Sequence, residues 1–199
     1  MTSEVFDLLL NAVRATHEAH PDLSDFCAFP EYVWQNPFTP RTVRASTEMQ
    51  RAPGQTIEAL AVMRDALLAA APSANWLDVY QDTDIGEDFL TRFGFFGLIG
   101  DTAPFMSDTM RAWMVYMPAG LHYPFHQHPA EEMYLVVSGS AEFQRAGHPP
   151  KLLGPGDTVF HASNEPHATI THDSPLMAYV IWRNRFETPP VLTTAETGA

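Results

Sequence analysis

Residues 120–139 read GLHYPFHQHPAEEMYLVVSG, and this stretch decides the fold that we expect for the chain. It contains a His-x-His pair, His126 and His128, and an acid, Glu132, between two flanking glycines. In an extended strand, side chains two residues apart leave the same face, so His126 and His128 share a face. Glu132 and Tyr134 are also two residues apart and share a face for the same reason.

A third histidine, His167, stands at the head of a later β run, after the turn Gly-Pro-Gly-Asp at residues 154–157. Two or three neutral imidazoles and a carboxylate that converge inside a small barrel form a ligand set for a divalent cation such as Zn²⁺ or Fe²⁺. A metal ion would also remove the cost of burying the Glu132 carboxylate without a partner. We therefore expect one divalent metal ion per chain, Zn or Fe, with Mn or Ni equally compatible with nitrogen and oxygen donors.

The second half of the chain consists of short β runs separated by turn residues. We expect strands at residues 112–117, 133–137, 141–144, 158–161, 168–171 and 177–182. Many short strands without intervening helices are typical of a closed sandwich or barrel. The pattern predicts a mostly β protein of the jelly-roll class, with its barrel over residues 101–190 and a tail over residues 191–199.

The first half has a helical pattern, in which Ile57, Leu60 and Leu67 belong to one apolar stripe. Such a stripe needs a partner surface, so we expect residues 1–100 to be an α-helical extension that packs on the barrel and closes one of its ends. The expected elements are a helix over residues 3–20, mostly loop with short helical turns over 21–54, a helix over 56–71, and a helix that runs into a packed turn over 87–100.

Composition excludes several classes of partner. The formal net charge of −13 disfavours nucleic acid and anionic membranes. No apolar run is long enough to span a bilayer, and the first residues carry acids where a signal peptide would carry bases. With Cys27 as its single cysteine, the chain can form no internal disulfide, so we expect a cytoplasmic protein.

Residues 120–139 resemble the first cupin motif, in which glycine, five residues, His-x-His, three or four residues, glutamate, six residues and glycine follow one another. Every anchor of that motif is present in register. Gly156 and His167 match the second cupin motif, which expects proline, glycine and asparagine at the positions of Ala162, Asn164 and Thr171. The resemblance implies a C-terminal cupin barrel, and the departures in the second motif leave its metal-binding histidine in place.

A narrower resemblance rests on Tyr123 and Tyr134, which the general cupin pattern does not require. Together with the helical first half, they make the chain similar to the cupin-type dimethylsulfoniopropionate (DMSP) lyases, closest to the DddQ branch. That family converts DMSP to dimethyl sulfide and acrylate, and the resemblance implies these metal ligands: His128, Glu132, His167 and Tyr134. His126 stands in the standard cupin ligand position, and in this family it is either a ligand or linked to the metal through water.

DMSP has a carboxylate, a neighbouring carbon whose proton must be removed, and a sulfonium leaving group. A divalent metal ion that holds the carboxylate stabilises the negative charge that develops there. It also lowers the pKa of a nearby phenol from about 10, so Tyr134 is one candidate base and Tyr123 is the other. Because aromatic faces attract onium cations, we place four residues at the substrate: Tyr123, His126, Trp182 and Tyr179.

Two other classes of function stay open at this point. The same residues suit another metal-dependent cupin enzyme, a dioxygenase or isomerase acting on a small carboxylate, or a cupin that binds a ligand without reaction. A DNA-binding sensor would carry a basic helical domain, which the acidic first half lacks. The expected partner is a small zwitterionic substrate, and the sequence leaves the oligomeric state open. His161 and His172 do not fit the motif spacing, so we assign both to structural roles.

Overall fold

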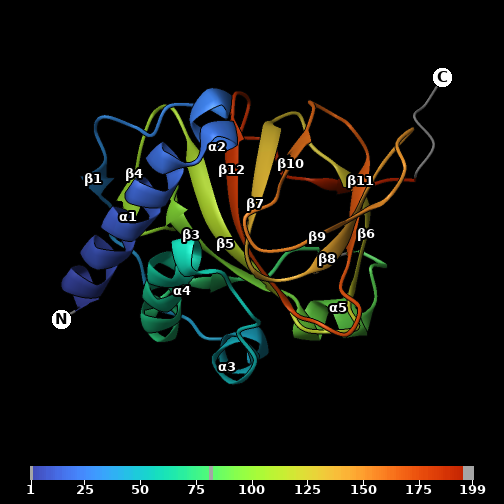
Figure 1. Ribbon diagram of the computed structural model, residues 1–199, viewed down its shortest axis with the longest axis horizontal. Coiled ribbons are helices and arrows are strands. Elements are labelled where there is room, and N and C mark those ends of the chain that lie inside the picture. The colour runs from blue at the N-terminus through green and yellow to red at the C-terminus, as the bar shows by residue number, and fades with distance from the viewer. Residues whose placement is uncertain (1, 81–82, 195–199) are drawn as a thin grey trace.

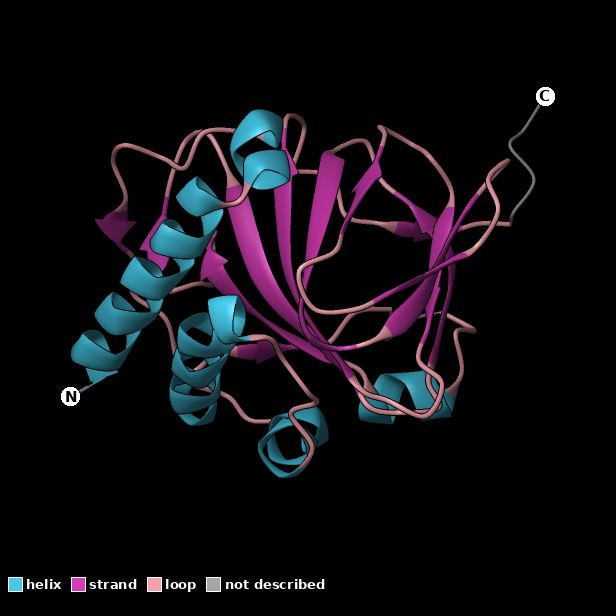
Figure 2. Cartoon of the chain, viewed as in Figure 1, coloured by secondary structure: helices cyan, strands magenta, loops and turns pink. Residues whose placement is uncertain are grey.

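The computed structural model, which describes residues 2–80 and 83–194, has three layers: helices, an eight-stranded sheet and a five-stranded sheet (Figures 1 and 2). The helices are α1 (Thr2–Ala19), α2 (Pro21–Phe26), α3 (Arg44–Arg51), α4 (Glu58–Ala70) and α5 (Glu87–Arg92), with a 3-10 turn at Ala71–Ser73. The two long helices that we expected are thus present. Among the described residues, none of the helices has the length and apolarity that a membrane span requires.

Both sheets are built mainly from the second half of the chain. The larger has the order β1 (Trp34–Gln35), β4 (Phe105–Met106), β3 (Gly94–Ile99), β5 (Arg111–Met117), β12 (Leu176–Arg183), β7 (Glu131–Gly139) and β10 (Thr158–His161), while β2 (Trp76–Leu77) pairs with β3. The smaller has the order β13 (Val191–Leu192), β6 (His122–Gln127), β11 (His167–Ile170), β8 (Ala141–Arg145) and β9 (Lys151–Leu153). All six expected strands are present, with bounds that differ by at most two residues.

The larger sheet is buried on both faces, as the alternation along β12 shows. Tyr179 and Ile181 pack in the cluster formed with the helices, whereas Val180 and Trp182 pack in the cluster shared with the smaller sheet. A sheet covered on both sides needs apolar residues at nearly every position, which explains the continuous apolar runs of β5, β7 and β12. The site lies in the second cluster, between the two sheets.

The helices cover a face of the barrel more than an end, which corrects our expectation. Leu60 and Leu67 of α4 are buried against the outer face of the larger sheet, while Ile57 is 44% exposed. Of the helices in the described part of the chain, α5 alone reaches the space between the sheets, where the Phe89 ring stacks on Phe93 with centroids 4.5 Å apart.

Residues 94–99 form strand β3, so the packed turn that we expected there was wrong. Their glycines allow close packing in place of a turn: a Cβ on Gly94 would lie 2.5 Å from the Ala45 Cβ, and one on Gly97 would lie 2.8 Å from the Ala103 Cβ. The sheet therefore begins before the boundary that we expected at residue 100.

The expected tail is also shorter than residues 191–199, because Val191 and Leu192 pair with β6 as strand β13. Residues 195–199 of that tail lie outside the described residues.

Candidate metal centre

The register of the larger sheet places a donor on each side of Glu132. His161 on β10 and Trp182 on β12 are its direct cross-strand neighbours. Such neighbours share a face, with Cβ atoms about 5 Å apart. Trp182 Nε1 donates a hydrogen bond to Glu132 Oε1 at 2.6 Å, and His161 Nδ1 donates one to Oε2 at 2.7 Å. Both oxygens of this buried carboxylate are therefore held in place.

Three further histidines reach the same point from the smaller sheet and its connection to β7. His126 on β6 lies opposite His167 on β11, and His128 follows β6. Each ring donates its Nδ1 proton to a backbone carbonyl: His126 to Pro124 at 2.9 Å, His128 to Ala130 at 3.0 Å and His167 to Glu165 at 2.8 Å. These bonds fix the tautomer, so that each neutral ring presents the lone pair of Nε2.

Donor atoms of these side chains lie within 4.8 Å of one another in two groups that share one residue: His126, His128 and His167, and Glu132, His161 and His167. Glu132 Oε2 lies 3.2 Å from His167 Nε2 and 3.4 Å from His128 Nε2. The Nε2 atoms of His128, His161 and His167 are buried without a hydrogen-bond partner among the described residues. The unpartnered nitrogens of His128 and His167 beside this carboxylate fit a divalent metal ion, which would accept a lone pair from each.

The charges within the cluster favour an ionised Glu132. Burial opposes its charge, but contacts with the His128, His161 and His167 imidazoles outweigh burial and hold the pKa of the carboxyl well below its usual range. Burial, reinforced by His167, lowers the pKa of His161 to about 3 and that of His126 well below its usual value. Both rings are therefore neutral near pH 7, as metal ligands and their neighbours must be.

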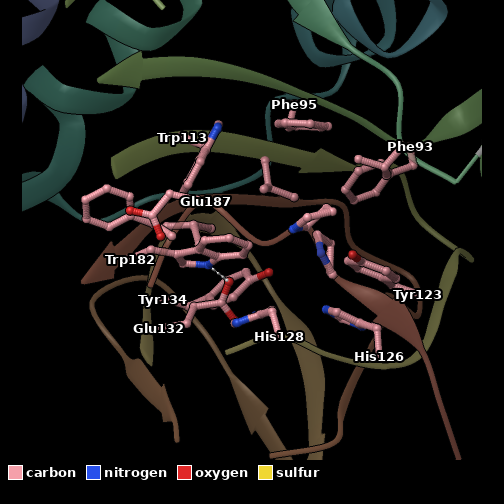
Figure 3. A pocket seen from close by; sticks show the side chains of 16 residues that line it. Phe93, Phe95, Trp113, Tyr123, His126, His128, Glu132, Tyr134, Trp182 and Glu187 are labelled. Atoms are coloured by element: carbon pink, nitrogen blue, oxygen red, sulfur yellow. Dashed lines mark hydrogen bonds and ion pairs between the residues drawn. The ribbon is translucent and has the colours of Figure 1, made fainter. Parts of the chain in front are cut away.

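A cavity of about 300 Å³ opens above this cluster, and its walls are mainly aromatic (Figure 3). His126, His128 and Glu132 line it together with both candidate bases, Tyr123 and Tyr134. His161 and His167 are buried and do not line it.

The two tyrosines differ in their surroundings. The Tyr123 ring stacks on His126 with centroids 3.8 Å apart, and its hydroxyl lies 3.0 Å from that of Tyr80. Tyr134 lies beside Glu132 and His128 in Figure 3. Burial, and after it the Glu132 charge, raises the pKa of Tyr134 well above its usual value, and burial does the same for Tyr123. Near neutral pH neither phenol ionises without a cation close by.

The structure thus brings the four expected histidine and glutamate ligands into one cluster, with Tyr134, Tyr123 and Trp182 at its cavity. Their roles as ligands, bases and substrate contacts stay predictions. Tyr179 is different: its hydroxyl lies 3.3 Å from His17 Nδ1 in the helix-facing cluster, so the expectation of a substrate contact was wrong. The alternation of β12 explains this, because Tyr179 and Trp182 are an odd number of residues apart.

His161 is the residue that sequence reasoning missed. We assigned it a structural role because no motif position corresponds to it, yet it contacts Glu132 directly. The strand that carries it, residues 158–161, was predicted correctly. The pairing register of β10 with β7 would have revealed the contact between His161 and Glu132, but sequence spacing alone does not give that register. His172, on the surface, lies 3.5 Å from Glu142 and away from this cluster.

Comparison with known proteins assigns the family. The family model for dimethylsulfoniopropionate lyase matches residues 39–178. The chain is 49% identical to the dimethylsulfoniopropionate lyase DddQ of Ruegeria pomeroyi over 98% of this chain and 97% of that protein. The crystal structure of the Ruegeria pomeroyi enzyme superposes with a TM-score of 0.93, at 48% identity over 98% of this chain and 99% of that one.

Two further structures extend the comparison. A crystal structure reported for the DMSP lyases RdDddP and RnDddQII superposes with a TM-score of 0.94, at 35% identity over 98% of this chain and 100% of that one. A cupin-2 domain from Rhodospirillum rubrum shares the fold alone, with a TM-score of 0.50 at 13% identity over 62% of this chain and 77% of that one. The chain therefore has the cupin fold and belongs to the DMSP lyase family.

Proposed function

We propose that this protein is a metal-dependent DMSP lyase, which converts DMSP to dimethyl sulfide and acrylate by β-elimination. One observation carries the proposal: the buried, unpartnered Nε2 atoms of His128 and His167 lie within 3.4 Å of the Glu132 carboxylate at an aromatic cavity, in a chain that belongs to the DMSP lyase family. A substrate with a carboxylate at one end and an onium group at the other suits a site that combines metal ligands with aromatic walls.

The residues that would hold a divalent metal ion are His128, Glu132 and His167, with His126 and Tyr134 as further candidates. When bound, the ion would supply a Lewis acid that stabilises charge on the substrate carboxylate and lowers the pKa of a phenol beside it. Zn, Fe, Mn and Ni all suit this mixture of nitrogen and oxygen donors.

The protein's own residues then perform the elimination. The phenolate of Tyr134, or that of Tyr123, takes the proton from the carbon next to the substrate carboxylate. The electron pair of that C–H bond becomes the new C=C bond, and the C–S pair leaves with dimethyl sulfide, so acrylate remains. The apolar walls exclude water from the reacting carbon, and the Trp182 face contacts the sulfonium.

We propose a cytoplasmic location, because the single cysteine Cys27 suits a reducing compartment. The partner is one small zwitterion, since an acidic surface of net charge −13 attracts neither nucleic acid nor anionic lipid.

The test is headspace detection of dimethyl sulfide from the purified protein incubated with DMSP, after elemental analysis of its metal content. We expect dimethyl sulfide and acrylate in equal amounts, and Glu132→Ala should release neither. Oxygen uptake without dimethyl sulfide would replace the lyase with an oxygenase. Absence of any turnover in a fully metal-loaded sample would reject an enzymatic role on DMSP.

A further inference from the structure

We infer that Trp113, Trp182 and Glu187 form a cation subsite that receives the sulfonium end of the substrate and fixes its orientation. The inference rests on the proposed function for the identity of the cation. The three residues line the cavity beside the proposed metal ligands, two of which Trp182 contacts directly. Figure 3 shows the three side chains on one side of the cavity.

The two tryptophans form an aromatic corner. Trp113 on β5 and Trp182 on β12 meet edge to face, with ring centroids 5.0 Å apart and planes at 67°. The Trp182 indole cannot rotate freely, because its Nε1 donates a hydrogen bond to Glu132 and the indole ring packs on His128 with centroids 4.2 Å apart. A rigid corner of indole faces is a binding surface for a methylated onium cation.

Glu187 adds a negative charge to this corner. It lies on the segment after β12 and lines the cavity, and its carboxylate forms no hydrogen bond or ion pair with another described residue. The neighbouring Phe186 carries the Arg111 guanidinium 4.2 Å from its ring centroid, and Asp101 lies 3.7 Å from that guanidinium. The Arg111 charge is thus partly balanced, and Glu187 stays available to a cation in the cavity.

The charges of the wall set the orientation. Among the described residues that line the cavity, Glu132 and Glu187 are the acids, and there is no lysine or arginine. A substrate carboxylate therefore has no basic side chain to bind in this wall and is directed to the metal centre. The onium group is directed to Glu187, the lining carboxylate that is not among the proposed metal ligands. DMSP bound this way presents the carbon beside its carboxylate to the tyrosines.

The test compares two probes of equal shape on the metal-loaded protein by isothermal titration calorimetry. One is 3-(trimethylammonio)propanoate, which keeps a fixed positive charge, and the other is 4,4-dimethylpentanoate, which places an uncharged tert-butyl group at that end. Wild type should bind the cationic probe more tightly. Glu187→Gln should weaken the cationic probe about five-fold and the neutral probe less than two-fold, since a partly exposed ion pair contributes modestly. Trp113→Leu should weaken the cationic probe about ten-fold.

Glu58→Gln, at the exposed start of α4, changes the net charge equally and is the control that should alter neither probe. Equal weakening of both probes by Glu187→Gln, or weakening of neither, would overturn the subsite. The outcome is separable from that for the lyase activity. Cation preference without release of dimethyl sulfide would support the subsite and reject the lyase, and release of dimethyl sulfide without cation preference would do the reverse.

Discussion

At the scale of single residues, the two candidate bases differ in what surrounds their hydroxyl groups. Tyr123 is held by Tyr80 and His126, whereas Tyr134 shares the strand face of Glu132. We expect Tyr134→Phe to keep its fold and most of its metal, because the ring still fills its space. Its turnover number should fall at least ~10³-fold, about 4 kcal/mol of transition-state stabilisation, in steady-state assays of dimethyl sulfide release.

Tyr123→Phe is the matched control for that experiment, since it also removes one hydroxyl from the cavity wall. If Tyr123→Phe alone causes the large loss at unchanged metal content, Tyr123 is the base and Tyr134 is a ligand or packing residue. If neither variant loses more than a few-fold, a phenolate does not take the proton, and His126 becomes the next candidate.

Metal content tests the ligands directly. We expect about one divalent ion per chain, because the donors converge on one small volume. His128→Ala, Glu132→Ala and His167→Ala should each lose the metal and the activity together, as measured by elemental analysis and dimethyl sulfide release. A variant that keeps near-wild-type turnover would remove its residue from the ligand set.

His161 should act on metal affinity through Glu132. Removing its Nδ1 donor with His161→Leu frees one carboxylate oxygen, and loss of such a supporting bond costs about 10- to 100-fold in affinity. Competition with a chelator measures the change, and His172→Leu on the surface is the control. Unchanged affinity would show that the bond is unimportant. A loss as complete as that of His167→Ala would make His161 a direct ligand.

At the scale of elements, a steric contact explains why the first motif ends in a glycine. Gly139, at the end of β7, has φ +74°, and a Cβ there would lie 1.7 Å from the Pro175 carbonyl oxygen. Gly147 has nearly the same φ, +76°, but open space around it. Gly147→Ala should cost about 1 kcal/mol of unfolding free energy, and Gly139→Ala about 3 kcal/mol or more, in urea denaturation. Equal costs for the two substitutions would mean that backbone strain alone requires a glycine at position 139.

The division of the chain at residue 100 is tested by a fragment that begins at Asp101. Such a fragment lacks β3, which lies between β4 and β5 in the larger sheet, and also lacks the helices that cover that sheet. We expect it to aggregate or to unfold without cooperativity in circular dichroism melts. A fragment that remains in solution and releases dimethyl sulfide would show that the helical extension is dispensable.

The sequence predicted those elements that a local pattern marks, and it failed where strand pairing decides the contact. Helices α1 and α4 have clear periodicity, the six main strands are short β runs between turn residues, and the first motif located Glu132 and its neighbours. Strand β3 was hidden by glycines that are required for packing against Ala45 and Ala103. His161 was missed because its contact with Glu132 depends on the register between β10 and β7, which no local pattern encodes.

At the scale of the whole molecule, His17 links the helical layer to the larger sheet. It is buried, and its ring nitrogens contact the Tyr179 hydroxyl at 3.3 Å and the Cys27 carbonyl at 2.8 Å. Burial lowers the pKa of His17 below 6.5 despite the opposing bond to Cys27 and the charge of Glu18. His17 is therefore protonated more readily in the unfolded chain than in the folded protein. The stability that neutral His17 supplies is complete above about pH 6.5 and declines below it.

The contribution of His17 to the unfolding free energy can decline by up to about 1.4 kcal/mol per pH unit. The unfolding free energy of wild type should thus exceed that of His17→Gln by less at about pH 5.5 than at about pH 7.5. Urea denaturation of both proteins at both pH values measures this, and the comparison cancels the contribution of the metal-site histidines. A gap that does not change with pH would exclude His17 as the source.

The candidate metal ligands come from both sheets: Glu132 from the larger, and His126 and His167 from the smaller. An ion held by both sets is a cross-link between the two halves of the barrel, which can separate only after the ion is released. Each tenfold excess of free metal over its dissociation constant then adds about 1.4 kcal/mol to the stability of the folded state. For a chain of this size that raises the melting temperature by about 3–6 °C. A thermal scan against a series of metal salts would therefore rank the ions by affinity without any substrate.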